Sequence, residues 1–325
     1  MAQFILINSI DILAAVIIDL ILGDPYWLPH PVIFIGKLIK AIEIKVRLIA
    51  KNQKQLKYLG GVMVLIVTSL CFLVPAALLY FIWPVKIIFH VLNTLFLWTT
   101  IAARCLRDES MKVYLALENN DMVNARRLTS YIVGRDTEKL DEKEVIRATV
   151  ETIAENSSDG VIAPLFYAFI GASPLAMLYK GINTMDSMVG YINEPYTHIG
   201  YFPAKTDDVF NFIPARLTGI IMCFTAPFMK ASIIKSLKVM IRDRKNHKSP
   251  NCAYPEAAAA GILGVQLGGN NIYFGNVVEK PTIGDKIMEL EKEHIASTNK
   301  IMFLTEFLFV VLNLILVCFV WRRIL

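Results

Sequence analysis

The sequence predicts an all-α protein that crosses a membrane several times, with a helical water-soluble segment and broken or re-entrant helices. Of its 325 residues, 55% are hydrophobic and only 19% are charged, and the mean hydropathy is +0.50. These values are too apolar for an ordinary soluble domain. The apolar residues also gather in runs of about 20, the length that a membrane-spanning helix needs. Because neither an internal repeat nor a low-complexity tract is visible, we expect one integral membrane domain over residues 1–325.

Four apolar runs are predicted to be membrane-spanning helices. They cover residues 4–22, 59–83, 85–103 and 301–321. The first of them has no preceding Lys or Arg and contains Asp11 and Asp19. We therefore expect a retained span rather than a cleaved signal peptide.

Three further apolar runs are interrupted or short. Residues 161–179 and 212–229 are long enough to span, but they contain Pro164, Pro174, Pro214 and Pro227. Proline removes a helical hydrogen bond, so either run is expected to be kinked or re-entrant. Residues 257–267 are too few to cross and predict a half-helix.

Basic residues are concentrated in two loops. Residues 37–57 hold seven Lys or Arg against Glu43 alone, and residues 230–248 hold seven against Asp243 alone. By the positive-inside rule both loops are expected to be cytoplasmic, where they contact anionic lipid head groups. No aromatic platform accompanies these residues, so the sequence does not predict nucleic-acid binding.

Residues 104–160 form the one sizeable polar segment, with nine basic and twelve acidic residues. We expect short helices on the membrane face. One helix should begin near Asp121 and end at Gly134, because glycine commonly ends a helix in a left-handed conformation. Another should begin at Asp141, since Glu144 three residues later completes a capping box.

A stripe of charged residues is expected on that second helix. If it runs from residue 142 to 156, Arg147, Glu151 and Glu155 lie on one face, and Asp159 extends the stripe if the helix persists. The alternative is a solvated charged face. Residues 157–160 are expected to break the helix at the edge of an apolar run, where polar groups must be solvated, paired or metal-bound.

A second polar cluster lies between two apolar runs, in residues 183–211 and just beyond. An ordinary loop between spans would also be polar, but its carboxylates lie against apolar residues. Oxygen ligands of this kind suit a hard cation such as Mg²⁺, which keeps waters and bridges phosphate oxygens. The cluster comprises Asn183, Asp186, Ser187, Glu194, Lys205, Asp207, Asp208, Asn211 and Arg216.

Two smaller stretches complete the candidate site. In residues 249–275, Pro255 should open a helix with Glu256 in its first turn, and Gly268 and Gly269 should close it. The N-terminus of such a helix favours binding of an anion. A helix of small residues that packs tightly against its neighbours explains the same sequence equally well. Near the first span, Asp24 begins a turn and His30 is held between two prolines, a setting in which a histidine is often structural.

Common nucleotide and hydrolase motifs are missing from the sequence: GxxxxGK[ST], GxSxG and HExxH do not occur. The five cysteines show neither CxxC spacing nor a nearby histidine cluster, so neither disulfides nor zinc are predicted. The residues alone therefore indicate a membrane-embedded, carboxylate-rich site that handles a phosphorylated substrate with a divalent cation.

Four stretches together resemble the CobD/CbiB family of cobalamin biosynthesis, the adenosylcobinamide-phosphate synthases. They are "ETIAENSSDGVIAPLFY", "YKGINTMDSMVGY", "DDVFNFIPARLT" and "PEAAAAGILGVQLGG", within a match from about Asp19 to Gly275. The chain departs from the family pattern at Ala253 and Tyr254, where Gly-Trp is expected, and at Asn270, where Pro is common.

The resemblance implies an ATP-dependent amide ligase in the cell membrane, with several spans and a cytoplasm-facing site. Such an enzyme joins the free propionate of adenosylcobyric acid to (R)-1-amino-2-propanol, its O-phosphate or an ethanolamine analogue. By analogy with other amide ligases, an acyl phosphate is the expected intermediate, with ATP and Mg²⁺ as cofactors. The implied partners are these small molecules, the lipid bilayer and neighbouring enzymes of the cobalamin pathway.

The resemblance marks positions, and their individual roles are our hypothesis. The expected catalytic residues are Glu151, Glu155, Asp159 and Asp186. The expected metal ligands are Glu155, Asp159, Asp207 and Asp208. The expected substrate-binding residues are Asp24, His30, Arg135, Asn156, Asn183, Ser187, Lys205, Asn211, Arg216 and Glu256.

Two other classes of protein fit parts of the pattern: a transporter, which also uses broken helices with intramembrane carboxylates, and a non-catalytic membrane sensor. The path of residues 161–179 decides whether the carboxylate clusters meet. If this run crosses, they lie on opposite sides of the membrane. If it forms a re-entrant hairpin that turns at residues 171–174, both face the cytoplasm, and we favour this arrangement.

Overall fold

The computed structural model describes residues 2–25, 27, 29–191, 193–269, 271–273, 276–278 and 281–324. Asn270 and Gly275, which belong to the family comparison above, lie outside the described residues. The chain divides into two compact units. The first comprises Met1–Ala102, Ala163–Asn211 and Leu312–Leu325, and the second comprises Ala103–Ile162 and Phe212–Val311.

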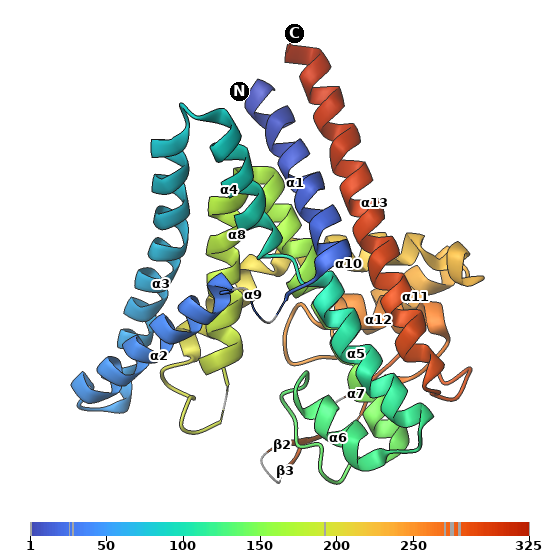
Figure 1. The fold of residues 1–325 in the computed structure, drawn as a ribbon. Helices are drawn as coiled ribbons and strands as arrows, with labels where there is room; N and C mark the ends of the chain where they lie inside the picture. The colour runs from blue at the N-terminus through green and yellow to red at the C-terminus, as the bar shows by residue number, and fades with distance from the viewer. Residues whose placement is uncertain are drawn as a thin grey trace. The chain divides into compact units, whose positions relative to one another are not determined.

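The first unit is built from helices, several of them long and apolar (Figure 1). They are α1 (Ala2–Leu22), α2 (Pro31–Ile49), α3 (Gln53–Ile82), α4 (Lys86–Trp98), α8 (Ala163–Val189), α9 (Tyr201–Phe210) and the last part of α13 (Glu293–Ile324). Helix α3 packs against α2, α8 and α9, and α1 packs against α4. Ile39, Met63, Val67 and Met185 are fully buried where α2, α3 and α8 meet, so apolar burial holds these helices together.

The second unit is also helical, with two short pairs of strands (Figure 1). Its helices are α5 (Ala103–Glu118), α6 (Met122–Ser130), α7 (Glu142–Asn156), a π-helix (Ser157–Ile162), α10 (Phe212–Phe224), a 3₁₀-helix (Ala226–Met229), α11 (Ile233–Asp243), α12 (Ala253–Leu263) and the first part of α13. Strand β1 (Leu267–Gly268) pairs antiparallel with β4 (Thr282–Ile283), and β2 (Asn271–Tyr273) with β3 (Asn276–Val278).

The all-α polytopic class is confirmed. Within the described residues, four helical runs are long and apolar enough to cross a membrane: Gln53–Ile82, Lys86–Glu118, Glu142–Val189 and Glu293–Val320. The first and last contain nearly all of the predicted spans 59–83 and 301–321. The predicted span 4–22 lies in α1. Nearly all of the predicted span 85–103 lies in the run Lys86–Glu118, whose helix is interrupted between the end of α4 at Trp98 and the start of α5 at Ala103.

Helix α10 has 13 residues, too few to cross a bilayer. The chain then forms a 3₁₀ turn and a left-handed residue at Lys230, with φ 57°. This agrees with the expectation that the prolines of residues 212–229 interrupt a straight span.

Helix α8 folds back on itself. Gly171 (φ −144°, ψ 30°) and Ala172 (φ 54°, ψ −157°) are not helical. The rings of Tyr167 and Tyr179 are stacked with their centroids 5.2 Å apart, whereas residues twelve apart in a straight helix are separated by about 18 Å. The two parts of α8 therefore form a hairpin that turns at Gly171 and Ala172, as the favoured re-entrant arrangement predicts.

Buried amides hold the tip of this hairpin. The Asn8 side chain donates to the Ala168 carbonyl at 2.9 Å, and the Ser173 amide donates to Asn93 Oδ1 at 3.2 Å. Asn93 in turn donates to Asp11 Oδ2 at 2.8 Å. A broken helix leaves backbone groups without helical partners, and in an apolar surrounding they must be paired. The amides of α1 and α4 supply those partners.

The predicted helix starts in the polar segment are confirmed, whereas two predicted ends are wrong. Asp121 caps α6, and Asp141 with Glu144 forms the capping box of α7. Helix α6 ends at Ser130 rather than at Gly134, and the backbone amide of Tyr131 closes its last turn by bonding to the Leu128 carbonyl. Helix α12 ends at Leu263 rather than at Gly268, since Gly264 already adopts the left-handed conformation (φ 69°) that ends a helix.

Residues 157–160 do not break the helix after α7, contrary to the expectation. The chain continues from Asn156 through a π-helix, Ser157–Ile162, into α8. The hydroxyl of Ser157 donates to the Ile153 carbonyl at 2.7 Å, which ties the transition to α7. A π-helix has a wider turn than an α-helix and is frequent at functional sites, so Asp159 lies in the altered register.

Replacing Gly60 by Ala is expected to destabilise the first unit by about 1–3 kcal/mol, the usual cost of overpacking. An added Cβ would lie 2.3 Å from the backbone oxygen of Ile199, which cannot move aside as a side-chain end can. Gly36→Ala is the matched control, because its Cβ would meet only Met188 Sδ at 3.6 Å. Thermal unfolding in detergent should show a lower midpoint for Gly60→Ala alone, and equal midpoints would contradict this packing.

Candidate active site

Glu151 lies on the buried face of α7 and is held by three groups. Its carboxylate pairs with Arg135, and the two side chains are 8% and 7% exposed. Glu151 Oε1 also accepts from the Gly268 amide at 2.8 Å and lies 3.9 Å from Arg147 Nε. Both carboxylate oxygens are therefore engaged, and the contacts join α7 to the loop before it and to β1.

One helical turn further, Glu155 belongs to a different cluster. The thiol of Cys252 donates to Glu155 Oε1 at 2.9 Å. Burial raises the pKa of this thiol well above its usual value, and the negative charges of Glu155, Asp159 and Glu256 raise it further. Cys252 therefore stays protonated at neutral pH. Three carboxylates from α7, the π-helix and α12 surround it, and Glu256 is buried.

The donor set of this cluster fits a hard divalent cation, because its ionised groups are all carboxylates. In the part of the chain that the structure describes, no group of three or more His, Cys, Asp or Glu side chains is arranged to hold a metal ion. Mg²⁺ usually retains several waters and binds through one or two carboxylates plus substrate phosphates. Glu155 and Asp159 therefore remain suitable ligands, and their metal role stays a prediction.

Arg216 and Asn156 lie near the ends of these elements. Arg216 donates to Asn251 Oδ1 at 3.2 Å, and its guanidinium lies over the ring of Tyr254, 4.5 Å from the centroid. This places Arg216 beside the segment that contains Cys252. Asn156 Nδ2 donates to the Thr152 carbonyl at 3.0 Å, and its substrate-binding role stays a prediction.

In the first unit, a second carboxylate cluster lies between α8 and α9. Asp207 is 9% exposed, and its Oδ2 accepts from Asn211 Nδ2 at 2.9 Å. Its Oδ1 is buried without a hydrogen-bond partner within the described chain. Burial raises the pKa of Asp207 from 3.8 to about 8, and the charge of Asp186 raises it as well, against the opposing amides of Asn211 and Asn183. The predicted neighbours Asn183, Asp186, Asp207 and Asn211 are thus brought together.

Other predicted residues of the first unit have simpler surroundings. Asp208 pairs with Lys205 at 2.8 Å, and the lysine is largely exposed. The Ser187 hydroxyl donates to the Thr184 carbonyl at 2.9 Å. His30 caps α2 by accepting from the Val32 amide at 3.2 Å, and its Nε2 lies 3.5 Å from Asp24 Oδ1. These contacts give His30 a structural role and fix the ring nitrogen that faces Asp24.

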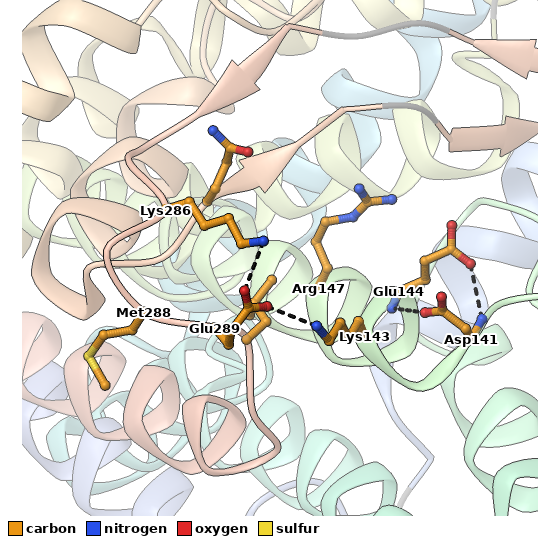
Figure 2. Close-up of a pocket in the computed structure, with 9 residues that line it drawn as sticks. Asp141, Lys143, Glu144, Arg147, Lys286, Met288 and Glu289 are labelled. Atoms are coloured by element: carbon orange, nitrogen blue, oxygen red, sulfur yellow. Dashed lines mark hydrogen bonds and ion pairs between the residues drawn. The ribbon is translucent and has the colours of Figure 1, made fainter.

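A cavity of about 220 Å³ lies beside the start of α7, lined by Lys143, Arg147, Lys286 and Glu289 among others (Figure 2). Lys143 and Lys286 both bond Glu289 at 2.8 Å. These two lysines hold the pKa of Glu289 down, at about 2. Because Glu289 is already shared by the two lysines, this cavity is a weaker candidate for an ionic substrate than the Cys252 cluster.

Sequence reasoning missed Cys252 and the Gly268 amide. Cys252 gave no signal, because a lone cysteine without CxxC spacing predicts nothing specific. The bond from Gly268 to Glu151 joins positions 117 apart in sequence. The predicted residues are divided between the two units. The clusters around Asp186 and His30 belong to the first unit. The second unit contains Arg135, Glu151, Glu155, Asn156, Asp159, Arg216 and Glu256. Whether the clusters face one another stays a prediction.

Replacing Asp207 by Asn is expected to stabilise the protein at alkaline pH. A folded-state pKa raised from 3.8 to about 8 favours folding fully below pH 3.8, and this contribution is lost as the pH rises through about 8. The thermal unfolding midpoint of Asp207→Asn should therefore be higher than that of wild type at pH 8.5, and the two midpoints should be equal at pH 4. Mg²⁺ should stabilise wild type at pH 8.5 but not the variant, if the site takes a cation. A constant difference at all pH values would contradict the raised pKa of Asp207.

Fold and site define a helical integral membrane protein with a buried carboxylate cluster at the junction of a π-helix and a short helix. Comparison with known proteins gives the family: residues 12–302 match the family model described as CobD/Cbib protein. The chain therefore belongs to this family.

Curated relatives agree along nearly their whole length. The cobalamin biosynthesis protein CobD of Clostridium acetobutylicum is 59% identical over 314 residues, covering 97% of this chain and 100% of the relative. CobD of Clostridium tetani is 57% identical, covering 93% and 96%. The cobalamin biosynthesis protein CbiB of Salmonella typhimurium is 42% identical, covering 88% and 90%. No solved structure matches the chain.

Proposed function

We propose that this chain is an ATP-dependent amide ligase of cobalamin biosynthesis. It joins the free propionate of adenosylcobyric acid to (R)-1-amino-2-propanol or its O-phosphate, or to an ethanolamine analogue. The family supports the role in cobalamin biosynthesis. The observation that carries the chemical proposal is the gathering of Glu155, Asp159 and Glu256 around the protonated Cys252 thiol.

The reaction needs an activated carboxylate, because a free carboxylate is a poor acyl donor. In the proposed sequence, an oxygen of the propionate attacks the γ-phosphorus of ATP and ADP leaves, which gives an acyl phosphate. The amine nitrogen then attacks the acyl carbon and phosphate leaves. Phosphoryl transfer depends mainly on positioning and on neutralising charge, and Mg²⁺ held by Glu155 and Asp159 would supply that neutralisation.

The chain's own residues have separate tasks in this proposal. The amine must lose a proton as it attacks, and a carboxylate of the cluster accepts it. Cys252 holds Glu155 by donating to one of its oxygens, which leaves the other oxygen for the incoming group. Arg216, positioned by Asn251 and Tyr254, offers its charge to phosphate oxygens. In the first unit, Asp186, Asp207 and Asn183 are proposed as a second place for metal or phosphate.

The purified protein should form the amide and ADP from adenosylcobyric acid, ATP, Mg²⁺ and an amino alcohol or its phosphate. A panel of aminopropanol, ethanolamine and their phosphates identifies the amine. Positional exchange of ¹⁸O from the propionate into released phosphate is expected for the acyl phosphate. Amide formation without that exchange would contradict the acyl phosphate intermediate. Failure to form an amide with any of the amines would contradict the ligase function.

A transporter is the second candidate, favoured by the α8 hairpin and by the buried polar groups at its tip. Broken helices with buried polar residues are common at the binding sites of transporters. Uptake of a labelled corrinoid into proteoliposomes without any amide formation would support that function instead.

The location we propose is the cell membrane, with the site facing the cytoplasm. Single cysteines introduced at Thr197 and Ser249 in a cysteine-free background test this. Labelling of both from the cytoplasmic side is expected. Labelling of the two from opposite sides would contradict the arrangement.

A further inference from the structure

A cavity larger than the one beside α7 lies away from the Cys252 cluster. It has a volume of about 970 Å³ and is formed by α6 and the segment that leads to α7. Arg126, Arg127 and Lys139 contribute positive charge to its lining, and Ser130 contributes a hydroxyl. Asp136 and Glu138 also line it. Arg135 closes one wall, where its guanidinium pairs with Glu151.

Three cations of this cavity are not neutralised by ion pairs. Arg126 Nε bonds the Leu140 carbonyl at 2.7 Å, and Arg127 Nη2 bonds Asn124 Oδ1 at 2.7 Å. Both acceptors are uncharged, and no ion pair involves Arg126, Arg127 or Lys139 within the described part of the chain. In the cavity beside α7, by contrast, two lysines share one glutamate. Unpaired guanidinium and ammonium groups around one cavity favour an anion with several oxygens.

The wall formed by Arg135 connects this cavity to the proposed reacting groups. Arg135 contacts Glu151, and Glu155 lies one turn further along α7, a rise of about 6 Å. An elongated anion that lay in the cavity and extended along α7 would bring its end toward Glu155 and Asp159. A polyphosphate chain has that length and charge, whereas a single phosphate would reach only one end.

We propose that this cavity binds the polyphosphate chain of a nucleoside triphosphate, with Arg127 and Lys139 as its contacts. The identity of the nucleotide as ATP rests on the proposed function. Arg126 orients the loop through Leu140, and Arg135 is a positioning residue held by Glu151. The site assigns the nucleotide to the second unit, within a few helical turns of the Cys252 cluster.

The double variant Arg127→Gln and Lys139→Gln tests the site, because neither side chain forms an ion pair that stabilises the fold. The matched control is Lys45→Gln with Lys54→Gln, which removes the same charge from two exposed positions in the first unit. The measurements are binding of a fluorescent ATP analogue to the purified full-length protein and its displacement by inorganic triphosphate or adenosine.

Wild type and control should bind the analogue equally, and the double variant about ten-fold or more weakly, because two charge-assisted contacts are lost. Triphosphate should displace the analogue and adenosine should not. Equal binding by the double variant would overturn the site even if wild type forms the amide. Amide formation is measured in parallel. If wild type binds triphosphate, the double variant does not, and neither protein forms the amide, then the site is supported and the ligase function is contradicted. Wild type that binds neither compound would overturn the inference.

Discussion

Replacing Glu155 by Gln, or Asp159 by Asn, is expected to abolish amide formation while the protein is still produced and folded. Each change removes one negative charge and keeps the shape of the side chain. If either group binds metal or accepts the amine proton, its loss should lower kcat by about 10²–10⁴-fold, the usual range for a general base. The measurement is product formation with saturating ATP and amine, together with the thermal unfolding midpoint of each variant.

The control is Glu142→Gln, which removes the same charge from an exposed position at the other end of α7. Its activity should be close to that of wild type. This control separates the effect of changing the net charge from the effect of changing a residue of the carboxylate cluster. Near-normal turnover in both Glu155→Gln and Asp159→Asn would show that the carboxylate cluster does not react. A collapse of stability in either variant would indicate that the cluster holds the fold instead.

The local features of this site could be predicted because they depend on neighbouring residues. The capping box fixed the start of α7, and the i, i+4 spacing placed Glu151 and Glu155 on one face. The π-helix could not be foreseen, since Ser157, Ser158 and Gly160 are equally typical of a helix break. Packing favours the π-helix over a break: Ser157, Ser158 and Gly160 are buried, and the π-helix that contains them leads directly into α8.

Contacts between distant positions account for what the sequence did not reveal. The pattern predicted the turn of α8 at residues 171–174, because glycine and proline lie together there, and the structure turns at Gly171 and Ala172. Nothing in the sequence indicated that Asn8 and Asn93 would pair with the backbone on either side of that turn. In the same way, nothing in the sequence indicated that Glu151 pairs with Arg135 and accepts from the Gly268 amide.

Glu151→Ala is expected to have the largest effect on stability, a loss of about 3–5 kcal/mol, because breaking one partner of a buried ion pair leaves the other charge buried and uncompensated. Arg135 would lose its partner, and the Gly268 amide would lose its acceptor. Glu151→Gln should be intermediate, because an amide oxygen still accepts from Gly268. Thermal and denaturant unfolding in detergent measure both effects.

The double variant Arg135→Met and Glu151→Met distinguishes an anchor from a reacting group. Replacing a buried ion pair by apolar side chains of similar volume is often neutral or stabilising, so the double variant should recover most of the stability that Glu151→Ala loses. If Glu151 is an anchor, Glu151→Gln should lose stability and keep part of its turnover. If Glu151→Gln is as stable as wild type and inactive, Glu151 takes part in the chemistry alongside Glu155 and Asp159, and the pairing with Arg135 serves to tune it.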